Sequence, residues 1–177
     1  MKKFLILIIS VFAISTLDGS IFAQSQAEIS RDPDGTKILK GIISRHELES
    51  DTSFGWWSEN LKGYTPQSQA VAELKKNQHI QFIAFMGTWC DDSRFIVPKF
   101  YSLLEAAGFP QDRVTLIGVD RSKKTLSHLA EALNIENVPT IIVMNDGKEV
   151  GRVVEYGKSG AFDKDLAEII SSINASR

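Results

Sequence analysis

Short apolar runs alternate along the chain with segments that have the period of an amphipathic helix. Five runs rich in β-branched and aromatic residues predict strands. They cover residues 37–45, 79–87, 113–120, 140–145 and 148–157. Four segments with apolar residues three or four positions apart predict helices. They cover residues 67–77, 91–108, 123–134 and 161–174. Alternation of buried strands and helices favours a parallel sheet core.

Helix and turn signals punctuate this pattern. Thr65-Pro66 predicts a helix entry with Thr65 as the N-cap, and Ser122 predicts the cap of the helix at 123–134. Pro98 lies inside the helix at 91–108 and should kink it. Asn145-Asp146-Gly147 predicts a hairpin, which adds an antiparallel edge. The expected fold class is therefore α/β, with a mixed central sheet and helices on both faces.

The segment before Thr65 has a different character. Residues 24–37 are polar, with a turn signal at 32–35, and we expect a mobile leader there. The acidic start of residues 46–64 favours a short helix. Trp56, Trp57 and Tyr64 follow as an aromatic cluster. We expect this cluster to pack an N-terminal extension against the core, and a platform for carbohydrate or peptide is the alternative.

The first residues have the pattern of a secretory signal peptide. Two lysines precede a run of about a dozen apolar residues, which is short for a membrane span. We predict a signal peptide at 1–23, an N-terminal leader and extension at 24–64, and the main domain at 65–177. This implies export to a bacterial periplasm with no stable membrane association after cleavage. An uncleaved N-terminal anchor is the alternative.

Composition narrows the class of function. The chain has 177 residues, a formal net charge of -2 and no long basic cluster, which argues against a nucleic-acid partner. Its three histidines, His46, His79 and His128, lack the spacing of metal ligands. No phosphate-binding loop is present. We therefore expect no metal and no cofactor.

The only cysteine, Cys90, lies in the stretch FMGTWCDDSRFIVP between a predicted strand and a predicted helix. One cysteine excludes an intramolecular disulfide. The helix N-terminus favours a thiolate, whereas the adjacent Asp91 and Asp92 oppose a second negative charge, and Arg94 offsets them in part. We expect a moderately reactive thiol. The two acids also have a simpler role, since acids stabilise the first turn of any helix.

This stretch and three later motifs resemble the thioredoxin family. Trp89-Cys90 with Ser93 is similar to the family's Trp-Cys-x-x-Cys, and Arg94 and Pro98 follow at matching positions. The segment NVPT at 137–140, the hairpin at 145–147 and the glycine at 157 match in order. The resemblance covers about residues 65–174. It implies the thioredoxin fold, to which the segment before Thr65 is an N-terminal extension, and a cis proline at Pro139 that faces the cysteine.

The sequence departs from the family pattern at two positions. Ser93 replaces the second, resolving cysteine, and Ala84 stands where many family members bury an acid. Ser93 is either an ordinary polar residue of a first helical turn or a hydroxyl that donates a hydrogen bond to the Cys90 sulfur.

The resemblance implies thiol–disulfide exchange with protein or small-molecule thiols and disulfides. Since Ser93 cannot resolve a mixed disulfide, Cys90 would act as a monothiol. Trp89, Val138, Pro139 and Thr140 would form the substrate groove. Two alternatives stay open at this point: a non-catalytic binding module with a vestigial cysteine, and covalent dimerisation through Cys90. The oligomeric state is not predicted.

Overall fold

The computed structural model describes residues 26–175, and the predicted signal peptide lies outside them. A six-stranded sheet has the order β1-β2-β4-β3-β5-β6. Its strands are β1 (Gln26–Arg31), β2 (Lys37–Ile43), β3 (Gln81–Met86), β4 (Val114–Gly118), β5 (Thr140–Asn145) and β6 (Lys148–Val154). All five predicted strands are present, and β1 is an additional one.

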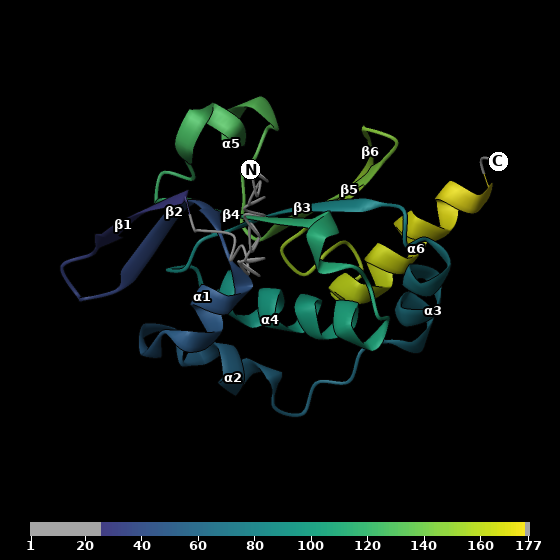
Figure 1. The fold of residues 1–177 in the computed structure, drawn as a ribbon, viewed down its shortest axis with the longest axis horizontal. Helices are drawn as coiled ribbons and strands as arrows, with labels where there is room; N and C mark the ends of the chain where they lie inside the picture. The colour runs from purple at the N-terminus through teal and green to yellow at the C-terminus, as the bar shows by residue number, and fades with distance from the viewer. Residues whose placement is uncertain (1–25, 176–177) are drawn as a thin grey trace, which may run out of the picture.

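Six α-helices accompany the sheet in this part of the chain. They are α1 (Arg45–Ser50), α2 (Trp56–Leu61), α3 (Ser68–Lys76), α4 (Asp91–Ala106), α5 (Leu129–Ala132) and α6 (Phe162–Ala175). Three 3-10 turns lie at Thr52–Phe54, Gln111–Arg113 and Leu126–His128. Figure 1 shows α5 above the sheet and α1, α2 and α4 below it. Within residues 26–175, no helix combines the length and apolarity needed to cross a bilayer.

The alternation of side chains along the strands divides the core between the two faces. In β3, Phe82 and Ala84 belong to the larger apolar cluster with α1, α2, α3, α4 and α6. Phe85 points the other way, into the smaller cluster with Ala130 of α5. Successive strand residues face opposite sides, so a strand buried on both faces reads as the continuous apolar run seen in the sequence. The mixed sheet with helices on both faces is confirmed.

The expected parallel core is wrong for most strand pairs. Only β3 and β4 pair in parallel among the described strands, and the other pairs are antiparallel. The connection from β4 to β5 starts and ends at one end of the sheet, because Met86 pairs with Gly118 and Phe85 pairs with Thr140. As a result, β5 starts where β3 ends and runs antiparallel to it.

The predicted helix at 123–134 is mostly absent, which explains this return. Its α-helical part is only α5, and four residues span about 6 Å, too short to recross the sheet. Asp120 Oδ1 accepts hydrogen bonds from the amides of Ser122 and Lys124, so a tight turn replaces the predicted Ser122 cap. Ser127 and His128 then adopt positive φ angles of 56° and 55° and interrupt the helix.

Two further expectations, on the start of α3 and on the leader, are wrong. α3 begins at Ser68 rather than at Pro66, since the Gln67 amide donates to Asp163 Oδ2 (3.1 Å) and holds the entry extended. The expected mobile leader is wrong for β1, which pairs along its full length with β2.

The expected packing of the extension is confirmed. Trp57 is buried against Tyr101, with ring centroids 5.7 Å apart.

The contact between β2 and β4 supplies a stability test. A Cβ at Gly118 would collide with the Leu39 carbonyl of β2. We expect Gly118→Ala to destabilise the protein at the upper end of the about 1–3 kcal/mol typical of overpacking, because the obstacle is backbone. Denaturant unfolding followed by circular dichroism measures this. Gly55→Ala is the matched control, since its Cβ would meet nothing closer than 3.9 Å. Equal midpoints for both variants would contradict the expectation.

Candidate functional site

The sulfur of Cys90 lies where the ends of two neighbouring strands meet. Cys90 is half-buried and is the N-cap residue of α4. Its Sγ donates to the carbonyl oxygen of Val138 at 3.2 Å. These residues are 48 positions apart and are brought together by the pairing of β3 with β5. The sequence placed Cys90 and Val138 at one site, and the structure brings them into contact.

The segment that faces the sulfur is held by its own hydrogen bonds. The Val138–Pro139 peptide bond is cis. The Pro139 carbonyl accepts from the Glu155 amide at 2.7 Å, and Thr140 Oγ1 donates to the Asn137 carbonyl at 2.7 Å. Thr140 is 1% exposed, so its side chain closes a turn and does not line a surface groove. The place of Thr140 in a substrate groove stays a prediction that concerns its backbone, since its side chain is buried.

Ser93 is fully buried in the first turn of α4, directly after the loop of residues 87–90 that carries Cys90 (the cysteine loop). Its Oγ accepts a hydrogen bond from the Gly87 amide at 3.2 Å, which ties the first turn of α4 to the end of β3. Among the contacts of the described residues, Ser93 forms no hydrogen bond with the Cys90 sulfur. Of the two roles considered for Ser93, the geometry therefore supports a polar residue in the first turn of the helix and not a donor to the sulfur.

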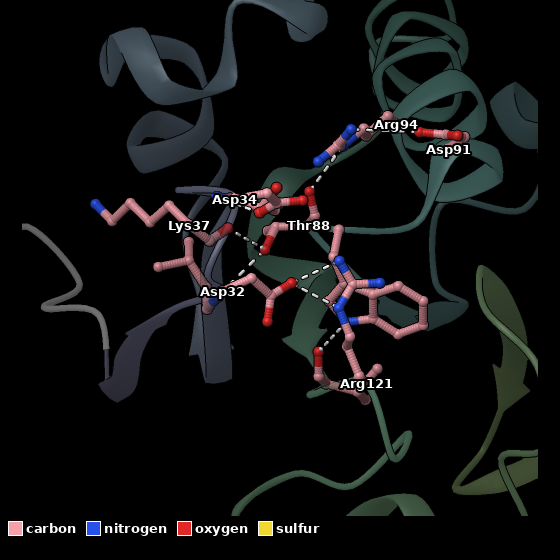
Figure 2. Close-up of polar contacts among 11 residues, drawn as sticks. Asp32, Asp34, Lys37, Thr88, Asp91, Arg94 and Arg121 are labelled. Carbon is pink, nitrogen blue, oxygen red and sulfur yellow. Dashed lines mark hydrogen bonds and ion pairs between the residues drawn. The ribbon is translucent and has the colours of Figure 1, made fainter.

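Asp91 and Arg94 lie on the outer side of the same turn. Arg94 Nε donates to the Thr88 carbonyl at 2.8 Å, and its Nη1 lies 3.3 Å from Asp91 Oδ1. The Asp91 side chain is 94% exposed, so this ion pair contributes little to stability. Arg94 thus braces the loop before Cys90, as Figure 2 shows.

Asp92 faces a tyrosine that the sequence did not single out. Burial first, and then a hydrogen bond with Asp92, raise the pKa of the Tyr156 hydroxyl, so Tyr156 stays neutral. The ring of Tyr156 lies 5.8 Å from that of Phe95, and both rings are exposed. The exposed rings of Phe95 and Tyr156 therefore lie beside Asp92, in the first turn of α4. Tyr156 lies just before the recognised Gly157, and that position was its only signal in the sequence.

Thr88 and Trp89 connect the cysteine loop to other parts of the sheet. Thr88 Oγ1 accepts from the Leu39 amide at 3.2 Å and donates to the Lys37 carbonyl at 2.9 Å, both in β2. Trp89 Nε1 donates to the Val119 carbonyl at 3.0 Å. Figure 2 shows Thr88 between Lys37 and Arg94. Sequence reasoning missed Thr88, because its partners lie in an extension outside the recognised pattern.

The surroundings of Cys90 offer little else for chemistry. Ala84 is fully buried in β3, so this position supplies a methyl group and no proton-accepting acid. Within residues 26–175, no group of three or more His, Cys, Asp or Glu side chains could hold a metal ion. The arrangement can therefore perform sulfur chemistry at one atom, beside an exposed aromatic surface and a cis-proline turn.

Comparisons with known proteins agree with this arrangement. The family model described as Thioredoxin matches residues 65–170. A TPR repeat-containing thioredoxin of Arabidopsis thaliana is 33% identical over 98 residues, which cover 55% of this chain and 24% of that protein. A Thioredoxin H-type of Oryza sativa subsp. indica is 32% identical over 100 residues, covering 56% of this chain and 73% of that protein.

One solved structure is similar over more of the chain. It is a protein of unknown function from Pseudomonas aeruginosa, with a TM-score of 0.52, covering 77% of this chain and 94% of that one. At 13% identity, this likeness concerns the fold alone.

The two hydrogen bonds of Thr88 can be tested by removing its hydroxyl. Thr88→Val leaves the Leu39 amide and the Lys37 carbonyl without this partner. We expect a loss of about 1–3 kcal/mol in unfolding free energy, the usual cost of buried polar groups left unsatisfied. Thr88→Ser keeps the hydroxyl and should retain most of the stability. Urea unfolding measures both, and a Thr88→Val variant as stable as the native chain would contradict the bridging role.

Proposed function

The chain belongs to the thioredoxin family, and on this basis we propose that it is an exported protein that performs thiol–disulfide exchange with Cys90 as its single sulfur. The observation that carries the proposal is the contact of Cys90 Sγ with the Val138 carbonyl beside the cis Pro139, at 3.2 Å. Export rests on the signal-peptide pattern of residues 1–23.

The proposed reaction has two steps that balance in atoms and charge. The Cys90 thiolate attacks one sulfur of a substrate disulfide, so that one S–S bond breaks, a Cys90 mixed disulfide forms and the other substrate sulfur leaves as a thiolate. A second thiolate then attacks the mixed disulfide and releases Cys90 as a thiolate. This second sulfur comes from the substrate itself or from an external thiol, because the chain holds no other cysteine.

Two features support a protein or peptide disulfide as the substrate. The backbone around Val138 lies beside the sulfur, where an extended segment can pair with it. Trp89 is half-buried next to Cys90 and offers apolar surface to the same segment. Val138 and Pro139 would orient the substrate, and Asp91, Asp92 and Arg94 would set the local charge around the thiolate.

Capture of a substrate disulfide tests whether Cys90 is the reacting sulfur. We expect Cys90→Ser to abolish mixed-disulfide formation with a peptide disulfide, because no other sulfur can form the bond. Intact-mass measurement of the purified chain after incubation with the peptide shows the adduct. Ser93→Ala is the matched control and should still capture. If native Cys90 neither forms the adduct nor reacts with iodoacetamide, the chain is a binding module with a vestigial cysteine.

Replacing Ser93 by cysteine would restore the second sulfur of the family motif. Residues 90 and 93 are one helical turn apart at the start of α4, a separation that a disulfide can span. We expect Ser93→Cys to gain dithiothreitol-dependent insulin reduction, at a cost of about 0.5–1.5 kcal/mol in stability from the weakened Gly87 hydrogen bond. Ser58→Cys, on the exposed side of α2, adds a sulfur elsewhere and should gain nothing. No difference between these variants would mean that the loop cannot support dithiol chemistry.

A further inference from the structure

We propose that Asp32, in the turn between β1 and β2, is a positioning residue for the loop that carries Cys90, and that it acts through Arg121 and Trp89. This inference rests on the proposed exchange reaction. Asp32 precedes the segment matched by the family model, residues 65–170, so this role belongs to the extension of this chain.

The indole of Trp89 is held on several sides. Its Nε1 donates to the Val119 carbonyl at 3.0 Å. Its ring lies so close to Gly87 that a Cβ there would stand 2.7 Å from a ring carbon. The guanidinium carbon of Arg121 lies 5.2 Å from the ring centroid, within the range of a cation–π contact. Because Trp89 immediately precedes Cys90, the position of this ring constrains the backbone that presents the sulfur.

Asp32 holds Arg121 in this place. Asp32 Oδ2 accepts from Arg121 Nε at 2.6 Å and also contacts its Nη2, so the carboxylate engages the guanidinium through two nitrogens. Both contacts go to the same oxygen, Oδ2, and they hold the Nε side of the guanidinium at Asp32. Figure 2 shows the Asp32 carboxylate directed at Arg121.

The turn that carries Asp32 is itself well fixed. The Asp32 amide donates to the Thr36 carbonyl at 3.0 Å, and the Asp32 carbonyl accepts from the Gly35 amide at 2.9 Å. Asp34 Oδ1 accepts from the Thr36 amide at 2.9 Å. These bonds close the turn between the paired strands β1 and β2, so the carboxylate of Asp32 is presented from a defined backbone.

An exposed ion pair adds too little to the unfolding free energy for the Asp32–Arg121 contact to be explained by stability alone. The Arg121 side chain is 51% exposed and that of Asp32 is 18% exposed, and pairs of this kind add little to the unfolding free energy. Their effect is on orientation: without Asp32 the long Arg121 side chain regains its rotamers and leaves the ring. Trp89 then keeps its Val119 hydrogen bond but loses the contact on its face.

The test compares two reactions of Cys90 in the full chain. For Asp32→Asn we expect the rate of mixed-disulfide formation with a peptide disulfide to fall about two- to fivefold, the loss expected for an exposed cation–π contact. The rate with iodoacetamide, which needs no groove, should stay unchanged. Asp32→Glu keeps the charge and should restore most of the peptide rate.

A matched control exists at another arginine that lies over an aromatic ring. Arg45 lies 5.4 Å from the ring centroid of Tyr101 and pairs with both Glu49 and Glu105 at 2.6 Å. The double variant Glu49→Gln/Glu105→Gln removes both acids from this arrangement, and we expect both rates to be unchanged; Glu49→Gln alone leaves Arg45 paired with Glu105. If the double variant and Asp32→Asn slow the peptide reaction equally, the effect is general and the proposal is overturned.

A second measurement reads the position of Trp89 directly. In nitrogen-15 spectra, Asp32→Asn should shift the Trp89 indole N–H resonance, because the cation leaves the ring face, while the Trp57 indole resonance stays in place. A Trp89 resonance identical to that of the native chain would overturn the proposal even if rates changed. If the native chain captures no peptide, the proposed reaction fails, and the indole resonance still decides whether Asp32 positions Trp89.

Discussion

The antiparallel pairing of β3 with β5 is the constraint on which the site depends. It sets Phe85 opposite Thr140, so the chain leaving β3 toward Cys90 meets the chain entering β5 through Val138. Both strands are buried on two faces, and a slip of one residue would turn every core side chain to the wrong face. The core pairing therefore brings the segment that carries the sulfur next to the Val138 backbone, and the contacts of the loop residues act within that frame.

Because Cys90 is the only cysteine, the residues around it have structural roles in place of a second redox role. Ser93 is buried and bonded to Gly87, and Ala84 fills the strand beneath with a methyl group. Neither residue supplies a second redox atom or a buried acid, so both contribute to packing and loop geometry. In the proposed reaction, Cys90 forms the mixed disulfide and the second sulfur comes from outside the chain.

Local signals account for what the sequence predicted well. The apolar runs of β3 and β5, the helix α4 and the motifs around Cys90 and Pro139 are readable because neighbouring residues carry them. Two failures have different causes. Asp163, 96 positions from Gln67, holds the entry to α3 extended, whereas Asp120 closes a local turn with the amides of Ser122 and Lys124, which no simple helix signal reveals. The contact between Asp32 and Arg121 joins residues 89 positions apart, and a polar edge strand leaves no apolar pattern that would announce it.

The hairpin formed by β1 and β2 also decides where the sheet ends. β4 is covered along one side by β2, so its main-chain groups at that side are paired inside the sheet. Without the hairpin, an apolar strand that includes Leu116 and Ile117 would become the border of the sheet and a template for pairing with other chains. β1 takes over that border with the charged residues Glu28 and Arg31. The extension thus pairs the edge of β4 inside the sheet, in addition to its contacts with the cysteine loop.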